Sequence, residues 1–427
     1  MLLSDLANKN IALWGMGREG ETTLAFLKNQ FPHKKFILIN DKPLQGFDQE
    51  RYIDEENLLN HLDDIDVVIK SPGISYYHDA VKIMQERGII ITSATNIWFS
   101  IPKQGKVIAI TGSNGKSTTS ALLHHILVSL GHNALLGGNI GTPLLSLAND
   151  SNYYIVELSS YQTCDLKYAP DIAVLLNLFP EHIQWHKNHD TYYKDKCNLL
   201  RRGSPFNIVN FNEPRTANIA ANSIFFNDVN AIHYGKETIL DGNDVIGSTV
   251  GHPLLGDHNL ENICAALSVC KILDLNLAEC LKASFNYPGL AHRLQMVGKF
   301  GKFHYVNDSI STDPEATIAG LKALKDKNIT LIAGGQDREQ DYSELCKFIE
   351  GHDNISVICI YQTGSRLLDQ LQSAHKQKAA SLAEAMSIAQ NITPEDGYIL
   401  LSPAAPSYDV FKNFEERGDL FIKLAKA

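Results

Sequence analysis

The amino-acid sequence predicts an α/β protein of three domains, and three observations lead to that prediction. At 427 residues the chain is too long for one ordinary core and, at roughly 150 residues per domain, should form about three. Short β-rich runs alternate with helical stretches, which indicates parallel sheets with crossover helices. Two glycine-rich turns, one near the N-terminus and one after residue 111, each follow a strand and precede a helix.

Residues 1–98 predict a Rossmann-like domain. Strands are expected at 10–14, 36–40, 67–70 and 89–92, with a helix at 22–29. Gly15, Gly17 and Gly20 form the pattern GxGxxG between the first strand and the helix, and Asp41 follows the next strand. This pattern favours a nucleotide diphosphate at the helix N-terminus, with Asp41 accepting hydrogen bonds from ribose hydroxyls. NAD binding and a turn that serves only tight packing are the alternatives.

Residues 99–288 predict a central P-loop ATPase-like domain with a parallel sheet. A linker at 101–105 precedes an expected strand at 107–111, and further strands are expected at 154–158 and 172–178. The first strand leads into TGSNGKSTT and a helix from about Thr118. Glycines allow backbone N–H groups to surround phosphate oxygens, while Lys116 can reach the β and γ phosphates and the Ser117 hydroxyl can ligate Mg²⁺. The nucleotide-binding residues are predicted to be Gly112, Ser113, Asn114, Gly115, Lys116, Ser117 and Thr118.

The spacing of this loop differs from the standard P-loop, because Ile110 stands where that pattern has its first glycine. The loop is therefore a shortened variant, GxxGKS. A plain strand-to-helix turn is the alternative, and the Gly-Lys-Ser-Thr run after an apolar strand favours nucleotide binding.

Residues 289–427 predict a C-terminal Rossmann-like domain. Strands are expected at 303–306, 329–333, 357–361 and 398–401, and helices at 314–325 and 381–390. The turn formers Pro288 and Gly289 mark the boundary with the central domain.

The composition narrows the class of protein. A formal net charge of -10 argues against a nucleic-acid partner, which normally requires a basic face. Seven scattered cysteines without a CxxC pair fit reduced thiols better than a disulfide framework or a zinc site. The start MLLSDLANKN has no signal-peptide character, and the apolar runs are far shorter than the ~18 residues a membrane helix needs. We expect a cytoplasmic protein that has no membrane partner.

Further motifs along the whole chain resemble those of the Mur ligase family. They are GMGREG, TGSNGKSTT, GGNIGTPL, VELSSYQ, FPEHIQWH with the nearby stretch 193–196, GDHNLEN, GLAHR, VNDS and LLSPAAPSYDVFKNFEERG. The resemblance implies domains that bind a UDP-sugar, ATP and an amino acid in turn. It implies a C–N ligase of peptidoglycan synthesis that activates a carboxylate as an acyl phosphate and adds glutamate to UDP-N-acetylmuramoyl-L-alanine. We expect the enzyme to be a monomer.

The resemblance also implies a catalytic set consisting of Lys116, Glu157, His182 and Lys196. Ser117, Glu157 and His182 would be ligands of Mg²⁺, and Lys196 would carry a carbamate. Without the motifs, Glu157 and His182 would be expected to face solvent and Lys196 to be a solvated charge on a helix. Further contacts to ATP are implied for Asn262, Arg293 and Asp308.

Substrate contacts follow from the same resemblance. The UDP-linked substrate is expected at Gly15, Gly17, Arg18, Glu19, Asp41, Asn139 and Ser159, although Arg18 and Glu19 differ in type from the usual family pair. Glutamate is expected at Thr312, Arg338, Ser407 and Phe414. Two lysines of the D-glutamate-adding enzymes are replaced here by Ile310 and Arg338, so L-glutamate is favoured and D-glutamate is the alternative.

Other classes explain less of the sequence. A folate-type glutamate ligase would share the short P-loop but would lack the GxGxxG domain. A nicotinamide oxidoreductase would leave the P-loop, Glu157 and His182 unused. A non-catalytic nucleotide-binding module would bind ATP without producing ADP, and the set of catalytic residue types argues against it.

Overall fold

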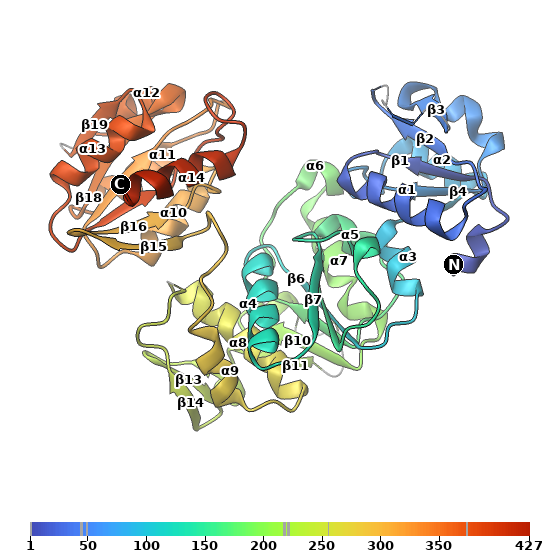
Figure 1. The fold of residues 1–427 in the computed structure, drawn as a ribbon, viewed down its shortest axis with the longest axis horizontal. Helices are drawn as coiled ribbons and strands as arrows, with labels where there is room; N and C mark the ends of the chain where they lie inside the picture. The colour runs from blue at the N-terminus through green and yellow to red at the C-terminus, as the bar shows by residue number, and fades with distance from the viewer. Residues whose placement is uncertain are drawn as a thin grey trace. The chain divides into compact units, whose positions relative to one another are not determined.

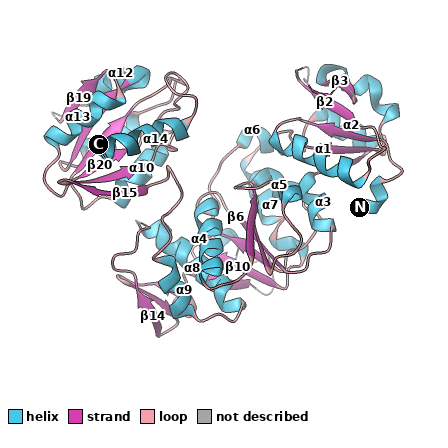
Figure 2. Cartoon of the chain, viewed as in Figure 1, coloured by secondary structure: helices cyan, strands magenta, loops and turns pink. Residues whose placement is uncertain are grey.

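A computed structural model describes residues 2–42, 46–47, 50–216, 219, 223–254, 256–372 and 375–427, and its strands form three sheets (Figure 1). The chain folds into two compact units. One comprises residues 1–250 and 261–284, and the other comprises residues 251–260 and 285–427. Helices alternate with strands in both units (Figure 2), so the predicted α/β class is confirmed.

The N-terminal sheet, blue in Figure 1, is parallel throughout and has the order β3-β2-β1-β4-β5. Its strands are β1 (Ile11–Trp14), β2 (Ile37–Asn40), β3 (Arg51–Asp54), β4 (Val67–Lys70) and β5 (Ile90–Thr92). Alternate residues of β1 face separate cores, Ile11 and Leu13 on one side and Ala12 and Trp14 on the other. A strand buried on both faces reads as a continuous apolar run, which is why IALW was recognisable in the sequence.

Three α-helices accompany this sheet in the described residues, α1 (Arg18–Gln30), α2 (Asp79–Glu86) and α3 (Ala94–Ser100), and Glu55–Asp64 forms a 3-10 helix after β3. The predicted boundary between residues 98 and 99 falls inside α3, and the division into three domains remains a prediction. Strand β3 was not expected, because RYID has exposed residues at two of its four positions and no clear apolar period.

The central sheet has the order β14-β13-β12-β11-β10-β9-β6-β8-β7. Its strands are β6 (Lys106–Thr111), β7 (Ala134–Gly138), β8 (Tyr153–Glu157), β9 (Ile172–Leu175), β10 (Phe206–Asn210), β11 (Ser223–Phe226), β12 (Ile232–Tyr234), β13 (Thr238–Asp241) and β14 (Asp244–Ser248). The sheet is parallel from β7 to β12 and ends in the antiparallel strands β13 and β14. Its helices are α4 (Lys116–Ser129), α5 (Ser160–Cys164), α6 (Ile183–His186), α7 (His189–Cys197), α8 (Asp257–Ile272) and α9 (Leu277–Ser284).

The C-terminal sheet has the order β15-β16-β20-β17-β18-β19, in which only the pair β15 and β16 is antiparallel. The strands are β15 (Gln295–Phe300), β16 (Phe303–Asn307), β17 (Ile329–Ala333), β18 (Ile355–Ile360), β19 (Lys376–Ala379) and β20 (Tyr398–Leu401). The helices are α10 (Pro314–Ala323), α11 (Ser343–Glu350), α12 (Tyr361–Gln370), α13 (Leu382–Ile392) and α14 (Phe414–Ala425). In the part of the chain that the structure describes, no helix is long and apolar enough to cross a membrane.

Candidate active site

The phosphate loop joins β6 to α4 as the sequence predicts. Gly115 has a φ of 83°, and a Cβ there would lie 2.3 Å from the Asn262 Oδ1 atom, so this position requires glycine. The loop backbone is held from outside, because the Asn114 N–H donates to the Asn177 Oδ1 atom at 2.8 Å. The Lys116 Nζ atom donates to the Ser113 carbonyl oxygen at 2.6 Å. Helix α4 begins at Lys116, so its N-terminus faces the loop and favours an anion there.

Asn262, on α8, lies beside this loop. Its Oδ1 atom accepts a hydrogen bond from the Thr119 hydroxyl at 3.1 Å, which ties α8 to the first turn of α4. Asn262 therefore belongs with the phosphate loop, although the two are far apart in sequence.

Glu157 ends β8, directly beside the strand that carries the phosphate loop, and is paired in register with Ile110. Its side chain is fully buried. The Oε1 atom accepts from the Asn139 amide at 2.6 Å, whereas the Oε2 atom has no hydrogen-bond partner among the described residues. A buried carboxylate oxygen without a donor is costly unless a cation neutralises it, so this position fits a metal ligand.

Lys196, on α7, is the second buried charged group of the site. It is 1% exposed, and its Nζ atom donates to the Gly112 carbonyl oxygen at 2.6 Å. Burial lowers the pKa of Lys196 well below its usual value, Lys116 acts in the same direction, and Glu181 and Glu157 oppose the shift. A neutral amine is the form that reacts with carbon dioxide, so these surroundings fit a carbamate.

His182 precedes α6 and has a φ of 53°, in the left-handed region. Burial lowers the pKa of His182, Glu181 opposes this shift, and Lys196 and Lys116 act in the same direction as burial. The structure therefore brings Lys116, Glu157, His182 and Lys196 into one electrostatic environment around the phosphate loop.

No group of three His, Cys, Asp or Glu side chains with metal-binding geometry occurs among the described residues. The predicted magnesium ligands are one hydroxyl, one carboxylate and one imidazole, so phosphate oxygens and water would have to complete the coordination. Phosphate oxygens, water and a carboxylate are usual ligands of Mg²⁺ in nucleotide sites, whereas an imidazole is an unusual one.

The residues predicted for the UDP-linked substrate divide into two groups. Gly17, Arg18 and Asp41 are exposed, and the Arg18 guanidinium donates to the Gly141 carbonyl oxygen at 2.9 Å. Glu19 is only partly exposed, and burial raises its pKa to about 7; the positive charge of Lys70 opposes this shift and the negative charge of Asp165 adds to it.

The remaining residues of that prediction lie at three turns. Gly15 has a φ of 89°, as the tight turn requires. The Asn139 amide donates its hydrogen bond to Glu157. The Ser159 hydroxyl caps α5 by accepting from the Gln162 N–H at 3.3 Å.

The residues predicted for glutamate and the last two for ATP lie in the second compact unit. Ser407 is 2% exposed, Phe414 begins α14, and the exposed Arg338 guanidinium lies 5.8 Å from the Tyr408 ring. The Thr312 carbonyl oxygen accepts from the Gln340 amide at 2.9 Å, which joins the loops after β16 and β17. Strands β16 and β17 lie on either side of β20 and are both parallel to it, so these loops leave the same carboxyl edge of the sheet, where open α/β sheets bind ligands.

Asp308 is buried and Arg293 is exposed in the same unit. The Asp308 carboxylate accepts from the Ser311 hydroxyl at 2.6 Å and the Ser402 hydroxyl at 2.7 Å. Burial raises the pKa of Asp308 to about 6, against the effect of these hydrogen bonds.

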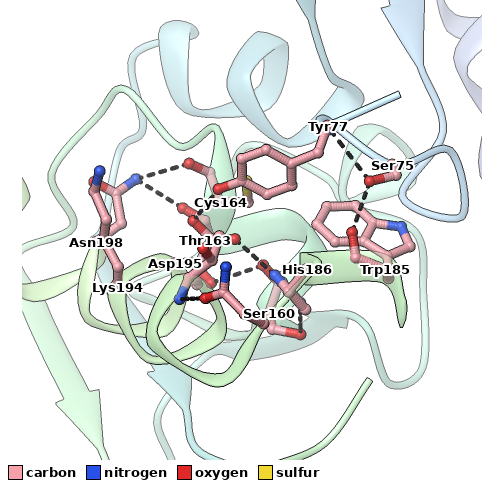
Figure 3. Close-up of polar contacts among 12 residues, drawn as sticks. Ser75, Tyr77, Ser160, Thr163, Cys164, Trp185, His186, Lys194, Asp195 and Asn198 are labelled. Carbon is pink, nitrogen blue, oxygen red and sulfur yellow. Dashed lines mark hydrogen bonds and ion pairs between the residues drawn. The ribbon is translucent and has the colours of Figure 1, made fainter. Parts of the chain in front are cut away.

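Sequence reasoning missed a hydrogen-bond network that joins the half-buried Tyr77 to the buried Asp195 and His186 and reaches Ser160 (Figure 3). A signal for it was present, since His186 belongs to the FPEHIQWH motif and Asp195 directly precedes Lys196.

Comparison with known proteins shows which family the chain resembles. The profile of the Mur ligase middle domain matches residues 110–270. The UDP-N-acetylmuramoyl-L-alanine–L-glutamate ligase of Xanthomonas campestris pv. campestris is 34% identical over 452 residues, which cover 100% of this chain and 97% of that protein.

Solved structures share the fold at lower identity. The UDP-N-acetylmuramoylalanyl-D-glutamyl-2,6-diaminopimelate–D-alanyl-D-alanyl ligase of Acinetobacter baumannii superimposes with a TM-score of 0.63 at 19% identity, covering 99% of this chain and 92% of that one. The MurF ligase of Thermotoga maritima in complex with ADP has a TM-score of 0.58 at 15% identity, covering 100% and 97%.

The phosphate loop and these similarities define an enzyme that forms a carbon–nitrogen bond with the use of ATP. The chain belongs to the Mur ligase family, whose members act in peptidoglycan synthesis.

Proposed function

We propose that the enzyme joins glutamate to the alanine carboxylate of UDP-N-acetylmuramoyl-L-alanine and that L-glutamate is the amino acid used. The observation that carries the proposal is the gathering of Lys116, Glu157, His182 and Lys196 around the phosphate loop, in a chain 34% identical over its full length to a ligase with that name.

In the proposed reaction the γ-phosphoryl group of ATP passes to the carboxylate, and ADP leaves. The glutamate nitrogen then attacks the acyl carbon, and inorganic phosphate leaves as the amide forms. Lys116 would hold the γ-phosphate and offset the charge that develops on it. Ser117, Glu157 and His182 would hold Mg²⁺, which would supply further neutralisation of the triphosphate. Lys196, as a carbamate, would add a negative group beside Gly112.

The substrates are assigned to three proposed domains. Residues 1–98 would bind the UDP-linked substrate, residues 99–288 ATP, and residues 289–427 glutamate. Asn262 supports the ATP assignment through its bond to Thr119, and Arg293 and Asp308 would make further ATP contacts.

The preference for L-glutamate rests on the amino-acid site. Ile310 has no charge where the D-glutamate enzymes carry a lysine, and Arg338 presents a planar guanidinium in place of an ammonium group. Such changes alter the geometry in which a carboxylate is held, and the Xanthomonas relative is named for L-glutamate. D-Glutamate is the alternative.

The test is release of ADP and formation of the dipeptidyl product from UDP-N-acetylmuramoyl-L-alanine and ATP, with each glutamate enantiomer supplied separately. We expect turnover with L-glutamate and, in the Lys116→Ala control, a loss of at least 100-fold, because the γ-phosphate loses its cation. Turnover with D-glutamate alone would contradict the proposed L-glutamate preference but would support the proposed ligase reaction. Absence of product with either would reject the proposed substrates.

A further inference from the structure

A chain of buried hydrogen bonds runs beside the candidate active site (Figure 3). The Tyr77 hydroxyl donates to the Asp195 Oδ1 atom at 2.7 Å, and the His186 Nδ1 atom lies 2.6 Å from the Asp195 Oδ2 atom. The other ring nitrogen of His186 lies 2.9 Å from the Ser160 hydroxyl. Exposure is 0% for His186, 2% for Ser160 and 4% for Asp195, so these three residues are shielded from water, whereas Tyr77 is partly exposed.

The chemistry of these groups fixes the histidine. A carboxylate only accepts hydrogen bonds, so the His186 Nδ1 atom carries a hydrogen and the ring cannot turn over without losing that bond. Aromatic rings hold it from several sides, with centroids 4.4 Å away for Trp185, 5.2 Å for Tyr192 and 5.7 Å for Tyr161. A serine, a histidine and an aspartate in sequence also occur in hydrolases, but here the aspartate also accepts from Tyr77, so the set joins separate segments of the chain.

Each end of the network adjoins a different part of the candidate site. Ser160 begins α5, shortly after Glu157, and His186 ends the helix that follows His182. Asp195 directly precedes Lys196 on α7. The network therefore connects the segments that carry three of the predicted catalytic residues.

Tyr77 extends the network to the N-terminal sheet. It lies in the loop of residues 71–78, which follows β4, and other bonds from this loop reach the same segment. The Ser75 hydroxyl donates to the Trp185 carbonyl oxygen at 2.8 Å, and the Trp185 indole N–H donates to the Gly73 carbonyl oxygen at 3.2 Å. The loop after β4 therefore forms several hydrogen bonds with the segment 185–195.

We propose that Tyr77, His186 and Asp195 are positioning residues. They hold the N-terminal sheet, which would bind the UDP-linked substrate, in a fixed position relative to His182 and Lys196. The expected effect on kcat rests on the proposed function, because it is measured in the ligase reaction. None of the three side chains needs to touch a substrate. Their loss should therefore leave the Michaelis constants nearly unchanged and lower kcat, because the reacting carboxylate and the γ-phosphate would be held less accurately.

The substitution Tyr77→Phe tests this with the removal of one hydroxyl group. Its matched control is Tyr76→Phe, in the same loop, because the Tyr76 hydroxyl accepts from the exposed Gln85 amide at 3.0 Å and phenylalanine keeps the edge-on contact of this ring with Tyr77. We expect kcat to fall about tenfold in Tyr77→Phe with both KM values within about twofold of wild type, and no change in Tyr76→Phe. An unchanged kcat, or a raised KM for the UDP-linked substrate with kcat unchanged, would overturn the proposal.

Two histidine variants separate the links of the network. In His186→Asn the amide nitrogen can replace the Nδ1 atom and still donate to Asp195. In His186→Gln the longer side chain places its amide near Ser160, where the Nε2 atom lies in wild type. We expect kcat to be several-fold higher in His186→Asn than in His186→Gln, because the bond to Asp195 holds α7, and with it Lys196, in position. The reverse order would show that the Asp195 link does not position the site.

A measurement without substrates keeps this inference separate from the proposed function. Amide hydrogen exchange in residues 189–197 should be faster in Tyr77→Phe than in wild type or Tyr76→Phe, because α7 loses a fixed contact. If wild-type protein makes no product, the proposed function fails and the exchange comparison still decides the positioning role. Equal exchange in all three proteins would contradict it.

Discussion

At the scale of single residues, the environment of Lys196 departs furthest from that of an ordinary side chain. A buried lysine normally has a carboxylate partner, yet in the described ranges the Lys196 Nζ atom bonds the Gly112 carbonyl oxygen and lies 5.2 Å from the centre of the Tyr192 ring, with no ion pair. The desolvation that would destabilise an ammonium group favours the neutral amine. The position is therefore costly for a structural lysine and suited to a chemically modified one.

Lys196→Ala should lower activity by at least about 100-fold, because the proposed carbamate, a negative group beside the phosphate loop, could no longer form. Short carboxylic acids such as acetate should restore part of the activity by occupying the vacated space. The control is Lys194→Ala on the same helix, whose side chain is exposed and whose loss should have little effect. Retained activity in Lys196→Ala, with no response to acetate, would count against the carbamate.

Glu19 is the second residue whose environment leads to a prediction. Burial raises its folded-state pKa to about 7, above the ordinary carboxyl value, so the folded protein holds this proton more tightly than the unfolded chain does. Stability linked to Glu19 is then complete below about pH 4.5 and is lost as the pH rises through about 7. Because Glu19 is partly exposed, we expect a loss of only about 1–2 kcal/mol.

Urea denaturation at pH 5.5 and pH 8 measures this effect. The destabilisation between these two pH values should be smaller in Glu19→Gln than in wild type. Glu21→Gln, an exposed position on the same helix, should behave like wild type. If Glu19→Gln and Glu21→Gln showed the same pH dependence of stability, the loss of stability between pH 5.5 and pH 8 would not come from the burial of Glu19.

At the scale of elements, the glycine-rich turn before α1 performs two separable tasks. A Cβ at Gly20 would lie 2.2 Å from the Gly15 carbonyl oxygen, whereas one at Gly17 would meet no atom within 4 Å. The third glycine of the pattern therefore allows helix and turn to pack closely. The second leaves the backbone open to solvent, where a pyrophosphate could approach it.

Gly20→Ala should destabilise the protein by about 2 kcal/mol, because the clash is with backbone and no side chain can swing away. Gly17→Ala should leave thermal stability unchanged and raise the KM for the UDP-linked substrate several-fold. Thermal denaturation and steady-state kinetics of the two variants check both statements. Equal destabilisation by the two substitutions would refute the division of tasks.

At the scale of the whole molecule, the predicted binding residues are distributed between the two compact units. The phosphate loop, Glu157, His182 and Lys196 lie in the first, and the residues predicted for glutamate lie in the second. The first unit contains the N-terminal and central sheets and the second contains the C-terminal sheet, so a substitution in a loop of the C-terminal sheet should act mainly on the ligand bound there.

Ser407→Ala should therefore raise the KM for glutamate about tenfold, as expected for the loss of one hydrogen bond to a charged ligand, and leave the KM values for ATP and the UDP-linked substrate unchanged. Ser387→Ala, at an exposed position on α13 in the same unit, is the control. A change confined to the KM for ATP would assign Ser407 to a different ligand.

Much of the fold could be read from the sequence because parallel strands buried on both faces are continuous apolar runs. VVIK, ITLIA and YILL were predicted with the bounds that the structure has. The strands β12, β13 and β14 were missed, since a short, half-exposed antiparallel meander has neither that composition nor a clear alternation.

By itself, the sequence determined the α/β class, the phosphate loop and the candidate catalytic residue types, because glycine spacing and local charge act over a few neighbouring positions. Only the tertiary structure decided that Glu157 is buried with an unpaired oxygen, that Glu19 is partly buried, and that Tyr77 bonds to Asp195. Burial and hydrogen bonding between distant segments depend on how sheets and loops pack, and a linear pattern does not encode that packing residue by residue.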